Sequence, residues 1–392
     1  MIILKRIIAG MTAALLAVIL VFPFQVHGIS AQSALLLDCA TGRVLYSKAA
    51  DQKRLIASTT KIMTALLVCE QCNVLDRVKI PKDAVGVEGS SMYLQSDEIL
   101  TVQELLYGMM LHSGNDAATA LAIYCGGTVD GFVQMMNDKA RTLGMADTHF
   151  ENPHGLDAEN HYSTAEDLGK LAAYAMGNPI FAKVVSTKNV QVGERHLKNH
   201  NKLLWSVEGA DGIKTGYTKK AGRILVSSAN RQGRRLVAVT IAAPDDWNDH
   251  KQLLETGFSM YTPQKIIDKN VVIGVIEVAG GCEQQVELVA ADDFCYSVGN
   301  DEEIEVVLSE PGFVYAPVVT GQAAGYAQVY LDDQWIGKVP LTFGSTIEKK
   351  EEKPKGWTRL FGGKHHEGTY TENTVSTGCV LSQTGGRDDQ GR

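Results

Sequence analysis

The sequence predicts a mixed α/β (α+β) domain with an antiparallel sheet flanked by helices, followed by a small all-β domain. A hairpin-like segment, a helix-rich block and three strand-like runs follow one another up to residue 261, and short strands broken by Gly and Pro come afterwards. The chain has 392 residues, of which 45% are hydrophobic and 21% charged, so it can bury a sizeable core.

The mixed domain begins with a β-hairpin. In segment 33–48, "SALLLDCATGRVLYSK", two apolar runs flank a turn at 40–42. The next segment, 57–72, has apolar residues at helical spacing after a polar start of Ser and Thr, which predicts an amphipathic helix.

A helical subdomain fills the middle of the mixed domain. Apolar residues repeat at helical spacing on both sides of 112–115, so we expect two helices joined at "HSGN". Segments 129–145 and 164–176 predict two more helices. This block is inserted between the hairpin and the strands that follow.

Strand-like runs then return at 213–218, 223–229 and 235–242, with turn residues between them. Segment 249–261 has helical spacing again. We therefore expect an antiparallel meander covered by a helix.

The C-terminal part changes in character. Residues 262–345 contain short strand-like runs with Gly and Pro between them, which predicts a separate all-β domain. Residues 346–392 are charged and Gly-rich, which predicts a disordered tail. Within the tail, "KGWTRLFGG" is either a short membrane-surface anchor or a solvated stretch.

The first 28 residues are typical of a secretory signal peptide. Lys5 and Arg6 precede an apolar run, and Pro23 and small residues follow it. Cleavage after Gly28 would leave a mixed domain of 29–261, although the run is also long enough for an uncleaved anchor. Either way, we expect the rest of the chain outside the cytoplasm, in the cell wall or at the outer face of the membrane. A net charge of -8 argues against nucleic acid as a partner.

Seven cysteines are scattered along the chain and form no compact disulfide framework. Cys69 and Cys72 stand as C-x-x-C, which suits a redox or metal role. No second pair of this kind accompanies them, so two thiols at a helix end are the simpler interpretation.

Ser58 and Lys61 are the first candidates for chemistry, because residues three apart share one helix face. Backbone N–H groups at a helix start lack helical partners and favour developing negative charge. A lysine amine whose pKa is lowered by burial or by cationic neighbours can act as the base that a serine nucleophile needs. A helix cap followed by an exposed lysine would explain an isolated S-x-x-K equally well.

Two further short motifs strengthen this hypothesis. Ser113 and Asn115 form S-G-N in a helix connection, where the hydroxyl could relay a proton and the amide could hold a carbonyl, although a capped turn also fits. Lys214, Thr215 and Gly216 form K-T-G in a predicted strand. They offer fixed positive charge, a hydroxyl for a carboxylate and room for another backbone, although an ordinary strand end has the same residues.

S-x-x-K, S-x-N and K-T-G, in this order, are the signature of penicillin-binding proteins and serine β-lactamases. The chain most resembles the low-molecular-mass D-alanyl-D-alanine carboxypeptidases, closely over 33–261 and more loosely over the β domain. The strings that carry the resemblance are "ASTTKIMTALL", "EGSSMYL", "LLYGMMLHSGNDAATALA", "NPHGLD" and "DGIKTGYTKKAGRILVSSA".

The resemblance implies a penicillin-binding/β-lactamase-like fold, and neither a metal nor an organic cofactor. It implies peptidoglycan stem peptides ending in D-Ala-D-Ala as substrates and β-lactams as covalent inhibitors. Ser58 would be the nucleophile and Lys61 its base, with Ser113 and Lys214 assisting the proton relay; which group is the true base in such sites is disputed.

The resemblance also implies how the substrate is held. Asn115 would bind the peptide carbonyl, and Lys214 and Thr215 the terminal carboxylate. Gly216 belongs to the same motif. The backbone N–H groups of Ser58 and Tyr217 would form the oxyanion hole.

The sequence departs from the family at one position. Several relatives carry an arginine after the strand that follows K-T-G, whereas "APDDWNDHKQLL" has none. His250, Lys251 or nothing could take its place. A β-lactamase is the alternative enzyme, although Glu166 lacks the E-x-x-L-N spacing of class A. Endopeptidase or transpeptidase action and an inactive penicillin-binding sensor are further alternatives.

Overall fold

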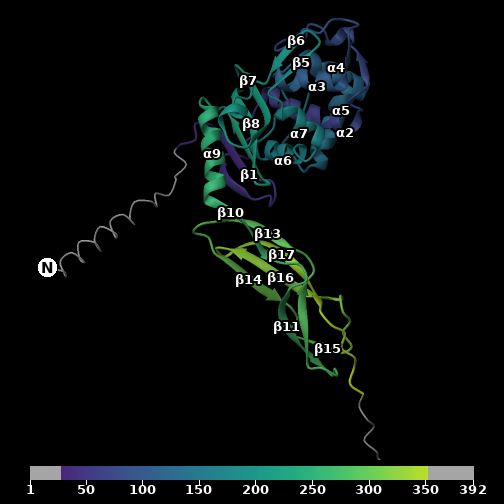
Figure 1. Cartoon of the computed structure of the whole chain (residues 1–392), viewed down its shortest axis with the longest axis vertical. Coiled ribbons are helices and arrows are strands. Elements are labelled where there is room, and N and C mark those ends of the chain that lie inside the picture. Colours follow the sequence, from purple (N-terminus) through teal and green to yellow (C-terminus); the bar gives the residue numbers. More distant parts are fainter. Residues whose placement is uncertain (1–27, 352–392) are drawn as a thin grey trace, which may run out of the picture.

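The computed structural model describes residues 28–351. The predicted signal peptide, apart from Gly28, and most of the predicted tail lie outside these residues. A mixed body formed by the N-terminal elements is followed by a β body (Figure 1). In the range 28–351 no helix is both long enough and apolar enough to cross a membrane.

The mixed body is built on a five-stranded antiparallel sheet with the order β2-β1-β9-β8-β7. The predicted hairpin and meander are thus both part of one sheet. The strands are β1 (Ser33–Asp38), β2 (Val44–Lys48), β7 (Ala210–Thr218), β8 (Gly222–Arg231) and β9 (Arg234–Ile241).

Both faces of this sheet are covered. Leu35 and Leu37 of β1 pack into the core shared with the helical subdomain, whereas Leu36 packs with α9 (Asp246–Met260) on the other face. Because successive side chains of a strand point to opposite faces, a strand covered on both faces is apolar throughout. This explains the continuous run of leucines in β1.

The helical subdomain contains the predicted helices, with η1 (Ala57–Thr60) as a 3-10 turn leading into the first of them. A capping box of Thr101 and Glu104 begins α3. Two helices, α7 (Pro179–Ser186) and α8 (Leu203–Ser206), and two short hairpins were not predicted, and α9 begins three residues before its predicted start. The helices are α2 (Lys61–Gln71), α3 (Val102–Leu111), α4 (Asn115–Gly126), α5 (Val129–Thr142), α6 (Ala165–Ala175), α7 (Pro179–Ser186) and α8 (Leu203–Ser206), and the hairpins pair β3 (Arg77–Lys79) with β4 (Ile99–Thr101) and β5 (Asn189–Val192) with β6 (Arg195–Lys198).

The C-terminal body is all-β, as predicted. A six-stranded sheet has the order β14-β16-β17-β12-β11-β15, and β10 pairs with β13 beside it. Three of these strands, β10, β13 and β15, were not predicted. The strands are β10 (Tyr261–Ile267), β11 (Val272–Ala279), β12 (Gln285–Ala290), β13 (Phe294–Gly299), β14 (Ile304–Ser309), β15 (Phe313–Tyr315), β16 (Ala323–Leu331) and β17 (Gln334–Phe343).

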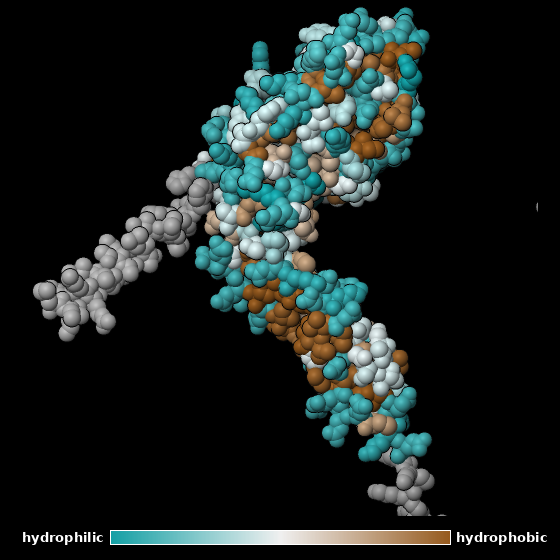
Figure 2. All heavy atoms as spheres, viewed as in Figure 1, coloured by the Kyte–Doolittle hydropathy of each residue, from teal (hydrophilic) through white to brown (hydrophobic). Residues whose placement is uncertain are grey.

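Apolar side chains remain on the surface of the C-terminal body. Figure 2 shows hydrophobic atoms gathered over the region of β14 and β16. Val306 and Val307 of β14 and Tyr326 of β16 are among the exposed apolar residues. This patch belongs to the β body and is separate from the sheet that carries K-T-G.

The two bodies meet at a buried carboxylate. Asp38, at the end of β1, accepts from Arg234 Nε at 2.8 Å and from Ser297 Oγ of β13 at 2.6 Å. Arg43 lies between the rings of Tyr261 and Tyr296 at 5.1 Å from each centroid. These contacts join the hairpin of the mixed body to β10 and β13.

Replacing Asp38 with Ala should destabilise the chain by about 3–5 kcal/mol, because the Arg234 guanidinium would stay buried without its counter-charge. Urea unfolding of the full chain measures this loss. Glu255→Ala breaks the half-exposed pair with Arg231 and should cost about 0–1 kcal/mol. Equal losses for the two variants would contradict the buried-charge account.

Candidate active site

The three motifs meet at one cavity of about 320 Å³. Ser58 comes from η1, Ser113 from the α3–α4 connection, and Thr215, Gly216 and Tyr217 from β7. The cavity is also lined by Ser90, His200, Arg223, Asp246 and Trp247. A larger hollow of about 750 Å³ shares His200 with it, but the S-x-x-K, S-G-N and K-T-G residues do not line that hollow.

Ser58 lies in the 3-10 turn, one residue after Ala57, whose φ is 43°. Such left-handed backbone is uncommon outside glycine and often marks a functional site. Lys61 begins α2, and its Nζ lies 3.0 Å from Ser58 Oγ. The serine and lysine therefore face one another, as their spacing predicted, although the serine precedes the α-helix proper.

The Lys61 amine is completely enclosed. It donates to Asn115 Oδ1 at 2.6 Å and to the His154 carbonyl at 2.7 Å, and its third contact is Ser58 Oγ, from which a neutral amine accepts the hydroxyl proton. Burial, and then the nearby charge of Lys214, lower the pKa of Lys61 well below its ordinary value, and Asp116 opposes them. The site thus favours the neutral amine that a general base requires.

Asn115 links the first two motifs to a loop at the cavity edge. Its backbone N–H donates to the Ser90 carbonyl at 2.7 Å, and its side-chain Nδ2 donates to the Glu88 carbonyl at 2.5 Å. An amide NH₂ has two hydrogens, so one remains for a substrate carbonyl. Ser113 is buried and has φ 63°, so left-handed backbone occurs in S-G-N as well as directly before S-x-x-K.

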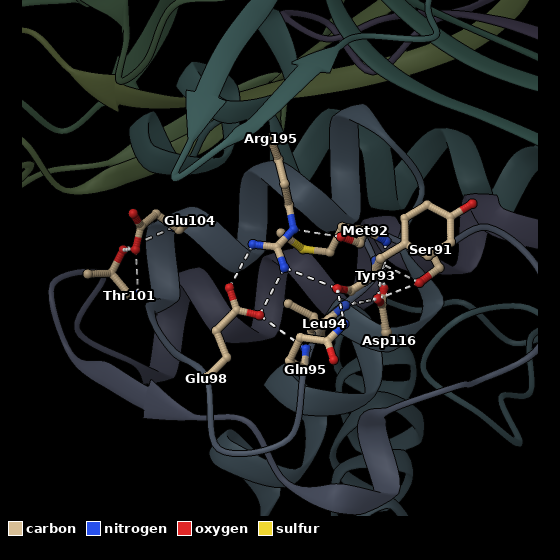
Figure 3. A network of polar contacts seen from close by, with 10 residues as sticks. All are labelled: Ser91, Met92, Tyr93, Leu94, Gln95, Glu98, Thr101, Glu104, Asp116 and Arg195. Carbon is tan, nitrogen blue, oxygen red and sulfur yellow. Dashed lines mark hydrogen bonds and ion pairs between the residues drawn. The ribbon is translucent and has the colours of Figure 1, made fainter.

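A polar network fixes this loop (Figure 3). The buried Asp116 carboxylate accepts from Ser91 Oγ at 2.6 Å and from the backbone N–H groups of Met92 and Leu94 at 3.1 Å. From the other side, Arg195 donates to the Met92 carbonyl at 2.7 Å. Residues 91–94 are therefore held from both sides next to Ser90, which lines the cavity.

K-T-G lies on the edge strand β7, so the N–H and C=O groups on its outer side have no neighbouring strand in this sheet. A Cβ at Gly216 would lie only 3.2 Å from the backbone nitrogen of Ser58. Glycine therefore lets the strand approach the serine closely, as we expected from its place in a strand. This approach brings the N–H groups proposed for the oxyanion hole to the same cavity.

Lys214 differs from the expectation of a fixed positive charge. Its side chain is buried, and Nζ donates to the Thr215 carbonyl at 3.0 Å. Burial lowers the pKa of Lys214 to about 7. Its charge in the ligand-free site therefore changes near neutral pH.

A fourth segment supports the site, and our reasoning from residue chemistry missed it. The His154 carbonyl of this segment accepts from Lys61, and the Pro153 carbonyl accepts from Thr64 Oγ1 at 2.6 Å. Gly155 has φ 91°, and a Cβ there would lie 1.9 Å from the Ala57 carbonyl oxygen. The signal was the string "NPHGLD", which had been used only for the family resemblance.

The two candidates for the missing arginine do not lie at the cavity. His250 is completely buried, with one ring nitrogen 2.6 Å from Ser227 Oγ and the other 2.8 Å from Thr240 Oγ1. Burial lowers its pKa to about 3. Lys251 lines a different hollow. Arg223 of β8, which pairs with Tyr217 in the sheet, is instead the cation at the cavity wall.

Comparison with known proteins agrees with this geometry. Residues 22–245 match the family model described as D-alanyl-D-alanine carboxypeptidase, and residues 261–349 match the penicillin-binding protein 5 C-terminal domain. The chain belongs to the D-alanyl-D-alanine carboxypeptidase family.

Relatives and solved structures support the assignment. D-alanyl-D-alanine carboxypeptidase DacF of Bacillus subtilis is 32% identical over 81% of this chain and 86% of its own length. The crystal structure of penicillin binding protein 5 from Haemophilus influenzae matches with a TM-score of 0.72 and 30% identity, covering 82% of this chain and 98% of that one. The chain is thus a serine-type D-Ala-D-Ala carboxypeptidase with the fold of this family, and the β-lactamase alternative is not favoured.

A further likeness concerns the mixed body. The Streptomyces K15 DD-transpeptidase structure has a TM-score of 0.58 and 36% identity, and it covers 59% of this chain and 98% of that one.

Replacing Lys214 with Met should stabilise the chain increasingly as pH falls from about 10 to about 7. In that window the unfolded lysine binds a proton that the folded lysine has lost, so the unfolding free energy of the wild type falls by up to about 1.4 kcal/mol per pH unit on acidification. Melting curves at several pH values measure the difference. Lys220→Met, at an exposed lysine, should show little pH dependence, and an equally flat difference for Lys214→Met would contradict the prediction.

Proposed function

We propose that Ser58 is the nucleophile that removes the terminal D-Ala from peptidoglycan stem peptides. The observation that supports this proposal most directly is the 3.0 Å contact between Ser58 Oγ and the enclosed Lys61 amine. A serine hydroxyl needs such a base, and a buried lysine can supply it.

The reaction has two stages, acylation of Ser58 and hydrolysis of the acyl-enzyme. Ser58 Oγ attacks the carbonyl carbon of the penultimate D-Ala while Lys61 Nζ takes the hydroxyl proton. The backbone N–H groups of Ser58 and Tyr217 hold the oxyanion. The peptide C–N bond then breaks, and a proton passes through Ser113 to the leaving D-Ala amine, with Lys214 assisting the relay. Water later attacks the ester carbonyl while Lys61 takes its proton. The ester C–O bond then breaks, the proton returns to Ser58 Oγ, and the shortened peptide leaves as its carboxylate.

The substrate lies along β7. Asn115 donates its free amide N–H to the peptide carbonyl, and Thr215 and protonated Lys214 bind the terminal carboxylate. Gly216 keeps the strand close to Ser58. A bound carboxylate would favour the charged form of Lys214, because an opposite charge raises the pKa of an amine.

Arg223 completes the carboxylate site in this proposal. Its Nε and Nη2 both donate to one oxygen of Asp246, at 3.1 and 2.7 Å, and within residues 28–351 its Nη1 donates no hydrogen bond. A guanidinium can contact two carboxylates because it presents five donors. The Asp246 pair would thus hold Arg223 at the wall where the terminal carboxylate enters.

The domain boundaries and the location are also proposals. We propose 1–28 as a signal peptide, 29–261 as the catalytic domain, 262–345 as the all-β domain and 346–392 as a tail with a candidate membrane-surface anchor. The family's D-Ala-D-Ala substrates belong to the cell wall, which supports export. A mass spectrum of the mature N-terminus tests the cleavage site.

Ser58→Ala should abolish both penicillin acylation and D-alanine release. Intact-protein mass after incubation with penicillin, and D-alanine release from diacyl-L-Lys-D-Ala-D-Ala, measure the two activities, which should fall at least about a thousandfold. Ser90→Ala, at a serine that lines the same cavity, should keep the adduct. An adduct that survives in Ser58→Ala would overturn the nucleophile assignment.

Arg223→Gln should raise KM for a peptide with a free C-terminal carboxylate about tenfold, a loss of about 1.4 kcal/mol of binding. Arg223→Lys should recover part of the loss. Arg231→Gln removes an arginine at the far end of the same strand, which bonds Glu255, and should leave KM unchanged. If Arg223→Gln behaved like Arg231→Gln, the terminal carboxylate would not contact Arg223.

A further inference from the structure

The helices α2 and α4 pack against one another and start at the catalytic motifs. At their first residues, Lys61 Nζ bonds Asn115 Oδ1 at 2.6 Å. Cys72 directly follows α2 as its C-cap residue, and Cys125 lies in the last turn of α4. A rise of 1.5 Å per residue places both cysteines about 15–17 Å from the bonded end, so they lie at the same level.

At this far end the Cys72 and Cys125 thiols lie close enough for each to change the pKa of the other through a hydrogen bond. A second contact links the same corner, because Tyr124 Oη donates to Asp76 Oδ2 at 2.9 Å. The residue before Cys125 is therefore joined to the turn that follows Cys72. A disulfide needs its two Cα atoms within about 7 Å, and two packed helices that end at the same level are compatible with this separation.

Cys69, the other half of C-x-x-C, has a different environment. It is buried, and burial raises the pKa of its thiol to about 12. Cys72 and Cys125 are half-buried and within reach of a small molecule. The hydrogen bond from Cys125 lowers the pKa of Cys72, which makes Cys72 the better thiolate.

A metal site at these thiols is not supported. Among residues 28–351 no group of three or more His, Cys, Asp or Glu side chains is arranged to hold a metal ion. The C-x-x-C pattern of Cys69 and Cys72 therefore lacks the further ligands that a zinc site needs.

We propose that Cys72 and Cys125 form a reversible disulfide that links the far ends of α2 and α4. The oxidant is a small-molecule disulfide or a dithiol–disulfide oxidoreductase. The Cys72 thiolate attacks one sulfur of the oxidant and releases one thiolate. Cys125 then gives up its proton and attacks the Cys72 sulfur of the mixed disulfide, which releases the second thiolate. Two electrons and two protons pass to the oxidant, which becomes two thiols.

The cross-link would close the chain segment that contains α3 and S-G-N. A disulfide removes conformations mainly from the unfolded chain, so it stabilises the helical subdomain without a new contact at the cavity. Such bonds persist outside the cytoplasm, where we place this domain. The proposal itself does not depend on the carboxypeptidase assignment.

The test uses the full chain, reduced and then incubated with oxidised glutathione without oxygen. Peptide mapping without reduction should find a linked pair of peptides containing Cys72 and Cys125, lighter by two hydrogens than the two thiol peptides. The melting temperature of the oxidised protein should rise by about 5–10 °C and return after reduction. Penicillin acylation of Ser58 should continue in both forms.

Three variants distinguish the alternatives. Cys69→Ser should retain the linked peptides and the rise in melting temperature. Cys72→Ser and Cys125→Ser should lose both and carry glutathione on the remaining cysteine, and penicillin acylation of the reduced variants shows that they are folded. A Cys69–Cys72 link, or glutathione on Cys72 and Cys125 of the wild type without a link, would overturn the proposal.

Discussion

Enclosure of the Lys61 amine is the constraint on which the rest of the site depends. An ammonium without water is costly, so the amine must be either neutral or surrounded by acceptors. Here Ser58, Asn115 and the His154 carbonyl surround it, and each comes from a different segment. The same three contacts therefore lower the freedom of the base and bring S-x-x-K, S-G-N and the "NPHG" loop together.

The sheet supplies the fourth side of the site. β7 can bind an extended peptide because it is an edge strand, and its Gly216 lets it lie against Ser58. The cost of this arrangement is the second buried lysine, Lys214, whose positive charge in turn disfavours the charged form of Lys61. The two lysines would thus have different roles in the proposed site. The lowered pKa of Lys61 favours a neutral base, and the pKa of Lys214, about 7, allows a bound carboxylate to favour its charged form.

The sequence was informative where chemistry is local. Ser58 and Lys61 are three residues apart, so a helix period alone predicts their contact, and the continuous apolar runs of β1, β8 and β9 are sufficient to predict strands. The β5–β6 hairpin was missed, since its strands have only four residues each. The His154 contact was missed because a backbone carbonyl is contributed by any residue type and leaves no signature of its own.

The sequence also did not indicate that Arg223 lies at the cavity, because this position depends on contacts between distant segments. The family resemblance pointed to His250 and Lys251 as candidate cations. His250 is enclosed between Ser227 and Thr240, and Lys251 lines a separate hollow. Arg223 precedes them by more than twenty positions, and it reaches the cavity only because β8 pairs with β7 in the register that sets it opposite Tyr217. A guanidinium has to lie where the substrate carboxylate binds. Residues of β7, β8 and the start of α9 all line this cavity. In the proposed site, the carboxylate-binding cation can therefore come from different elements, whereas Lys61 as the proposed base must stay one helical turn from Ser58.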